Sequence, residues 1–108
     1  MINGSKTFIT GGMTSDYFVI PARTGGAGLD GISLFFVEAD TAGFSRSALT
    51  RKMGWWCSDQ ATLFLDEVRV PASHMMGEEG TGFLAIMNNF NYERLAMTAG
   101  SLGMMRLC

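Results

Sequence analysis

Residues 60–71 read QATLFLDEVRVP and carry the clearest strand signal in the chain. Apolar residues recur there at every second position, the period of a half-buried strand: Ala61, Leu63 and Leu65, then Val68 and Val70. Asp66-Glu67 interrupts the alternation and predicts a bend or bulge, and Pro71, which lacks a backbone donor, ends the strand. This stretch divides the chain, because the sequence before it predicts strands and the sequence after it predicts helices.

Four segments before residue 60 predict short strands, separated by Gly-rich or Asp-containing turns. They are residues 6–10, 17–23, 32–38 and 44–49. After a loop over residues 72–82, apolar residues at offsets of 3, 4 and 7 from Phe83 predict an amphipathic helix, and a second helix is expected from about Tyr92. The expected class is therefore α+β: a partial antiparallel β-barrel or sandwich to about residue 75, a loop, and two α-helices.

The two ends of the sequence carry unusual signals. Asn3-Gly4 is typical of a two-residue hairpin turn, because both central positions of a type I′ turn need positive φ. Only Met1 and Ile2 precede it, so the sequence predicts a hairpin whose first strand is missing. The helical pattern of residues 97–108 stops without a Gly cap or a Pro. Both observations predict a chain cut from a longer polypeptide.

Composition restricts the class of protein. The 108 residues have room for one small domain, which buries roughly 60 to 65% of its unfolded surface. A net charge of -2 without a basic patch argues against nucleic acid or an anionic membrane as the main partner. The longest strongly apolar run, residues 34–37, is too short to span a bilayer, and the first residues lack a signal-peptide pattern. The sequence therefore predicts a cytoplasmic protein without a membrane span.

Several reactive or Gly-rich features have an ordinary interpretation. Cys57 and Cys108 lack metal-ligand or redox spacing, and His74 has no second ligand at a suitable spacing, so no metal site is expected. Residues 24–31 contain several glycines, as phosphate cradles do. No Lys-Ser/Thr pair follows them and no helix begins there, so a flexible hairpin loop is expected instead.

Two places carry side chains suited to a site. Alternation puts Phe8 and Thr10 on one face of a strand, roughly 6.5 to 7 Å apart, where a ring and a hydroxyl could cover and hydrogen-bond a flat heteroaromatic ligand. An ordinary half-buried strand has the same pattern. Glu93-Arg94 fits a solvated or capping charge pair at a helix start. A Glu held in an apolar pocket between two helices could instead act as a general base, and the residues alone leave both alternatives open.

A series of short motifs runs in order along the whole chain. They include residues 3–10 (NGSKTFIT), 31–35 (GISLF), 52–54 (KMG), 64–71 (FLDEVRVP), 77–80 (GEEG) and 92–95 (YERL). In this order the motifs resemble the acyl-CoA dehydrogenase family. The resemblance implies the second half of the family's middle β-domain over residues 1–75, and a loop with the first helices of its C-terminal helical domain over residues 76–108.

The resemblance implies a flavoenzyme of fatty acid metabolism. Members of the family bind FAD and desaturate an acyl-CoA thioester: a Glu removes the α-proton, the β-hydride moves to flavin N5, and electrons pass to an electron-transfer flavoprotein. By the family's aromatic-Ile-Thr motif, Thr10 would hydrogen-bond the flavin near N5, Phe8 would lie against the ring system, and Ile9 would contribute backbone contact. Phe8 replaces a frequent Trp, which keeps a ring but removes an indole donor.

The resemblance also implies substrate residues. Asn91 and Arg94 match an acidic residue and an Arg that hold the pantetheine side of the substrate, and Asn in place of Asp keeps hydrogen-bonding capacity. Asp30 lies in the loop that approaches the CoA portion. Glu93 matches the catalytic base of isovaleryl- and long-chain-type members. In other members the base lies further along the C-terminal domain, beyond the position of Cys108.

The motifs found correspond to only part of such an enzyme, which implies a fragment. We expect it to bind FAD weakly or not at all, to have little dehydrogenase activity alone, and to form homo-oligomers through a cut barrel edge and an unpartnered helix. The competing hypothesis is a non-enzymatic module, derived from such an enzyme, that self-associates or binds a partner. The unpaired hairpin expected at Asn3-Gly4 favours that alternative.

Overall fold

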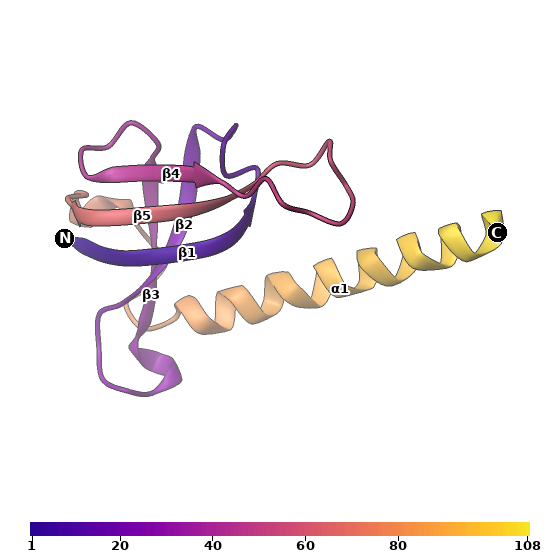
Figure 1. The fold of residues 1–108 in the computed structure, drawn as a ribbon. Helices are drawn as coiled ribbons and strands as arrows, with labels where there is room; N and C mark the ends of the chain where they lie inside the picture. Colours follow the sequence, from indigo (N-terminus) through magenta and orange to yellow (C-terminus); the bar gives the residue numbers. More distant parts are fainter.

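The computed structural model describes residues 1–108 and shows two small antiparallel sheets and one long helix (Figure 1). The first sheet has the order β1-β5-β4 and is made of β1 (Ile2–Thr10), β5 (Gln60–Val68) and β4 (Phe44–Ala48). The second has the order β2-β3-β6 and is made of β2 (Tyr17–Arg23), β3 (Ile32–Glu38) and β6 (Met75–Met76). The sheets do not close into a barrel, so the α+β class is confirmed in its sandwich form.

The core lies between the two sheets, and β5 supplies half of its fully buried apolar residues. The core cluster consists of Ala61, Leu63, Leu65 and Val68 from β5 with Ile2, Phe18, Ile20 and Val37. Leu63 is 1% exposed, whereas its neighbour Phe64 on the opposite face of the strand is 44% exposed. Burial of alternate apolar residues stabilises the sandwich, which is why the pattern of residues 60–71 identified this strand.

A bulge interrupts the pairing of β1 with β5 near the chain start. Two residues of β5, Asp66 and Glu67, lie opposite the single residue Asn3 of β1, as the interrupted alternation predicted. Glu67 has a φ of 53°. The Glu67 N–H donates to Asn3 Oδ1 at 2.7 Å. The hairpin turn predicted at Asn3-Gly4 is wrong, because both residues lie inside β1 and the positive φ of Gly4, 139°, accompanies the bulge. An Asn-Gly pair offers the same backbone freedom to a turn and to a bulge.

The segments around the second sheet are tied together by a buried hydroxyl. Ser33 on β3 is fully buried, accepts a hydrogen bond from the Gly80 N–H at 2.9 Å, and shares another with Thr24 Oγ1 at 2.8 Å. Residues 24–31 form the β2–β3 hairpin connection as predicted, and include η1 (Leu29–Gly31). Residues 72–82 are not purely loop, because η2 (Ala72–His74) is followed by β6, which pairs with β3.

The two predicted helices are one continuous helix, α1 (Gly82–Leu107), and the expected break near Tyr92 is absent. Residues 88–95 contain neither Gly nor Pro, so nothing there interrupts the helical hydrogen bonds. The helix contacts chiefly β3 and η1 with its first turns and then projects away from the sandwich (Figure 1). The radius of gyration is accordingly 16.0 Å, against about 13 Å for a compact chain of this length.

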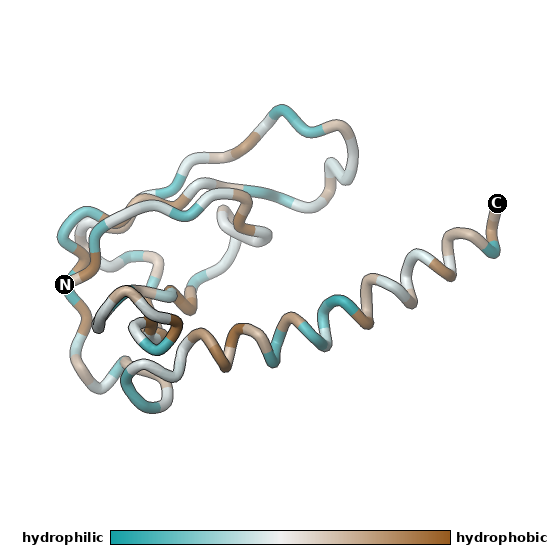
Figure 2. The backbone as a smooth tube through the Cα atoms, turned by 90° about the horizontal axis from the view of Figure 1, so that it is seen from below, coloured by the Kyte–Doolittle hydropathy of each residue, from teal (hydrophilic) through white to brown (hydrophobic).

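Apolar residues continue along the projecting part of α1 (Figure 2). Phe83, Ile86 and Met87 are half-buried against the sandwich, whereas Leu95 is 69% exposed and Leu102 is 48% exposed. No helix combines the length and the apolar character that crossing a membrane requires.

Candidate functional site

The end of β1 carries the first group of predicted site residues. Between Lys6 and Ile9 the pairing with β5 shifts register, and Phe8 has a φ of 61°. Bulges often re-aim a side chain beside a functional site, and a positive φ at an aromatic residue is a strained conformation. Phe8 is 78% exposed and Thr10 is also exposed, while Ile9 between them packs against the core. The prediction of a regular strand fails at Phe8, but both side chains lie on the surface.

An open cavity of about 370 Å³ adjoins Phe8. Its lining includes Phe8, Arg51, Lys52 and Gln60. The Lys52 ammonium donates to the backbone carbonyl oxygens of Trp55 and Ser58, so it holds the β4–β5 connection in place. The cavity therefore combines an exposed aromatic ring, an amide and cationic side chains, which suits a flat ligand with hydrogen-bonding edges.

Two residues at the start of β5 fix the end of β1. Gln60 Nε2 donates to Thr10 Oγ1 at 2.6 Å. The Asp59 carboxylate accepts from the Met13 N–H at 2.6 Å and from Thr14 Oγ1 at 3.4 Å. Sequence reasoning missed both residues. Their only signal was a place at, or directly before, the first residue of the decisive strand, since the pairing of Thr10 with Gln60 is visible only in the structure.

The middle of α1 carries the second group of predicted site residues. Asn91, Glu93 and Arg94 are all exposed. Glu93 Oε1 accepts a hydrogen bond from Asn89 Nδ2 at 2.6 Å, and the Arg94 guanidinium lies 5.7 Å from the Phe90 ring centroid. Asn91 and Arg94 are three residues apart and so share one side of the helix. The apolar pocket between two helices that we considered for Glu93 is not formed within this chain.

Asp30 forms a third location, in η1 on the β2–β3 connection. The residue is exposed. Arg23 braces the loop around it by donating to the carbonyl oxygens of Gly26 and Gly28. Gly80 packs against the same loop so closely that an added Cβ would lie 2.3 Å from the Asp30 carbonyl oxygen. The structure thus fixes the backbone around Asp30. None of the five main cavities is lined by residues from more than one of the three groups of predicted site residues.

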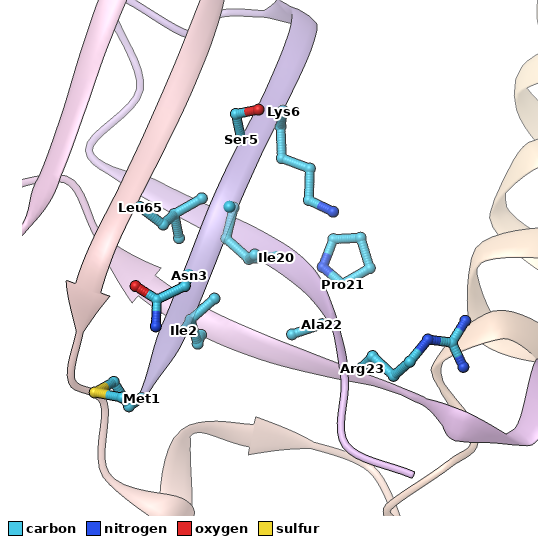
Figure 3. A pocket seen from close by; sticks show the side chains of 11 residues that line it. Met1, Ile2, Asn3, Ser5, Lys6, Ile20, Pro21, Ala22, Arg23 and Leu65 are labelled. Atoms are coloured by element: carbon cyan, nitrogen blue, oxygen red, sulfur yellow. The ribbon is translucent and has the colours of Figure 1, made fainter. Parts of the chain in front are cut away.

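A separate cleft of about 240 Å³ lies between β1 and β2 (Figure 3). These are the edge strands of the two sheets, and the side chains that flank the cleft include Ile2, Lys6, Ile20 and Arg23. None of the predicted site residues lines it. The cleft is therefore the open seam of the sandwich and is distinct from the cavity beside Phe8. No group of three or more His, Cys, Asp or Glu residues is arranged to hold a metal ion.

Comparison with known proteins gives consistent matches. The family model described as acyl-CoA dehydrogenase, middle domain, matches residues 1–68. Cyclohexane-1-carbonyl-CoA dehydrogenase of Geobacter metallireducens is 40% identical over 103 residues, which are 95% of this chain and 27% of that protein. The mitochondrial long-chain specific acyl-CoA dehydrogenase of Rattus norvegicus is 43% identical over 98 residues, 88% of this chain and 23% of that protein.

A solved structure of glutaryl-coenzyme A dehydrogenase in complex with glutaryl-CoA superposes with a TM-score of 0.87 at 36% identity. The superposition covers 94% of this chain and 26% of that one. The chain thus spans about a quarter of the length of the relatives it matches. Because the family model matches well over half of its residues, this chain belongs to the acyl-CoA dehydrogenase family.

Proposed function

We propose that this chain supplies one part of the flavin and substrate site of an FAD-dependent acyl-CoA dehydrogenase, an oxidoreductase that desaturates an acyl-CoA thioester. The observation that carries the proposal is the exposed Phe8 ring beside an open cavity that Gln60 also lines, with Gln60 donating a hydrogen bond to the Thr10 hydroxyl. We assign residues 1–75 to the second half of the middle β-domain. Residues 76–108 are then the loop and the first helical segment of the C-terminal domain.

The residues at the end of β1 fit one face of a flavin. The Phe8 ring is exposed to receive a planar system, the exposed Thr10 hydroxyl would meet its edge, and Ile9 between them packs against the core. FAD, when bound, supplies the acceptor for the hydride that leaves the substrate β-carbon. The role of this chain is then to orient the ring and to exclude water from one of its faces.

The residues of α1 and η1 fit the acyl-CoA substrate. Asn91 and Arg94 would hold the pantetheine side, and Asp30 would approach the CoA portion. Glu93 would remove the α-proton, which the neighbouring thioester carbonyl makes acidic, and Asn89 would orient its carboxylate through the 2.6 Å hydrogen bond. An electron-transfer flavoprotein would take the electrons afterwards.

A hybrid enzyme tests this proposal. We define the hybrid dehydrogenase as the rat long-chain relative in which residues 1–108 of this chain replace the corresponding segment. It should purify with FAD bound and dehydrogenate acyl-CoA. The double substitution Phe8→Ala and Thr10→Val should lower its FAD affinity roughly tenfold or more, because a stacking surface and a hydrogen bond are both lost.

The control is Phe64→Ala, which removes an exposed ring from the same sheet but away from the cavity, and it should leave FAD affinity unchanged. Bound flavin is measured by absorbance and by titration of the stripped protein with FAD. A folded hybrid that takes up no flavin, or a double variant that binds FAD as well as the parent hybrid, would exclude the proposed site.

A second candidate function is supported by the exposed face of α1. Leu95 and Leu102 are seven residues apart, so they lie on one side of the helix, and both are exposed. An exposed apolar helix face of this kind is typical of an interaction surface. A self-associating or partner-binding module is therefore the alternative to an enzyme part.

The 108-residue chain alone is expected to self-associate through this face. The substitutions Leu95→Arg and Leu102→Arg together should weaken the association at least about tenfold, because they place charges in the apolar contact. Leu29→Arg, at a residue 63% exposed in η1, is the matched control and should have little effect. Sedimentation equilibrium measures the association constant. A chain that stays monomeric at all concentrations, or equal effects of the two changes, would contradict this expectation.

A further inference from the structure

The hydrogen bond between Gln60 and Thr10 limits what the Thr10 hydroxyl can do. A hydroxyl has one hydrogen to donate and two lone pairs to accept with, whereas an amide NH₂ group only donates. Gln60 Nε2 donates to Thr10 Oγ1 at 2.6 Å, and this is the only hydrogen bond that the Thr10 side chain makes in the chain. The amide therefore occupies a lone pair of Oγ1 and leaves the hydroxyl hydrogen without a protein acceptor.

The strand framework holds Gln60 in position for this role. Gln60 pairs with Thr10 in the β1–β5 ladder, and its backbone carbonyl accepts from the Leu49 N–H at 2.8 Å on the other side. Its side chain is half-buried and lines the same cavity as Phe8. The amide thus comes from a strand fixed on both sides, while Thr10 itself is exposed. A hydroxyl that accepts from the protein and is exposed to solvent has its hydrogen free to donate to a ligand bound beside it.

We infer that Gln60 is a positioning residue that makes Thr10 a hydrogen-bond donor, and that the ligand group facing Thr10 is an acceptor, an unprotonated ring nitrogen or a ring carbonyl. The inference rests on the proposed flavin function and adds the direction of the hydrogen bond and the residue that sets it. It also gives a role to the half-buried Gln at the first position of β5.

The test uses the hybrid dehydrogenase, stripped of flavin and titrated with FAD, because the isolated 108 residues are expected to bind flavin weakly or not at all. Gln60→Glu keeps the side-chain size, but an ionised carboxylate only accepts, so it takes the Thr10 hydrogen and turns the hydroxyl away from the ligand. The FAD affinity of the stripped hybrid, measured by absorbance titration, should fall roughly tenfold. Gln60→Met removes the donor without adding an acceptor and should have a smaller effect.

A matched background separates the hydrogen bond from the added charge. In hybrids that already carry Thr10→Val, Gln60→Glu can act only through its charge, and should change FAD affinity by about threefold or less. An NMR measurement on the 108-residue chain without ligand checks directly that Gln60 is the donor. The side-chain NH₂ resonances of Gln60 should shift and exchange faster with solvent in Thr10→Val, because their acceptor is gone.

The outcomes separate the inference from the proposed function. If Thr10→Val weakens FAD binding but Gln60→Glu acts equally in both backgrounds, or if the Gln60 NH₂ resonances are unchanged by Thr10→Val, the inference is overturned and the flavin site stands. If the folded parent hybrid takes up no FAD, or the Thr10→Val hybrid binds FAD as tightly as the parent hybrid, the flavin site itself fails and the inference fails with it. Amide spectra of every variant confirm that the sandwich is folded.

Discussion

Turnover of the hybrid dehydrogenase should fall about a thousandfold when Glu93 is replaced by Gln, as expected for loss of a general base. The carboxamide has nearly the size of the carboxylate and can still accept from Asn89, which lies 2.6 Å away in the parent chain. It cannot take a proton. The effect should therefore appear in the rate at which bound flavin loses its visible absorbance after mixing with acyl-CoA, while FAD content and substrate affinity stay near those of the parent.

Two further variants are the controls for Glu93→Gln. Glu79→Gln changes an exposed carboxylate in the segment before α1 and should leave turnover unchanged. Asn89→Ala removes the donor to Glu93 but keeps the base, so turnover should fall only about tenfold. Normal turnover of the Glu93→Gln hybrid would place the base elsewhere in the enzyme, in the part of the family's C-terminal domain that follows residue 108.

The largest effect on stability is expected from Leu63→Ala in β5. Leu63 is 1% exposed and belongs to the core cluster between the two sheets. Truncating such a Leu removes apolar contact and leaves a cavity, at about 2 to 5 kcal/mol of unfolding free energy. A domain of this size has little stability in reserve, so a large part of the variant should be unfolded at room temperature. Urea titration followed by the amide signals of β5 measures the loss.

The neighbouring residue supplies the control for this substitution. Phe64 lies on the same strand with its side chain on the other face, and it is 44% exposed. Phe64→Ala should therefore destabilise the sandwich by about 1 kcal/mol or less, although Phe is the larger side chain. Equal losses for the two variants would show that the sandwich does not have its core where the alternation of β5 places it.

The strands could be predicted well because their signal is local. The buried face of β5 follows from the alternation of its apolar residues, which is a pattern of neighbouring positions. In β3 the buried positions include the polar Ser33, which alternation does not indicate. The turn assigned to Asn3-Gly4 failed because the same Asn-Gly backbone freedom serves a bulge once a partner strand is present. The two-residue strand β6 was missed because it exists only through its pairing with β3. The break expected in α1 failed because nothing local required one.

The candidate site was only partly visible in the sequence. Phe8 and Thr10 could be named from one motif, since they are neighbours on one strand. Gln60 could not, because it lies fifty positions away along the chain and reaches Thr10 only through the pairing of β1 with β5. Glu93 and Arg94 could be named as a pair, and a solvated pair was one alternative. Their place in the middle of a single projecting helix, and not at a helix start, could not be foreseen.

The sequence by itself determined the α+β class, the buried face of β5 and the family, because alternation and ordered motifs are properties of neighbouring residues. Only the tertiary structure decided that Asn3-Gly4 bulges instead of turning, that α1 runs unbroken, and that Gln60 holds the Thr10 hydroxyl. The physical reason is that strand register and side-chain hydrogen bonds join residues distant in sequence. Their free energy depends on the partner that folding brings alongside.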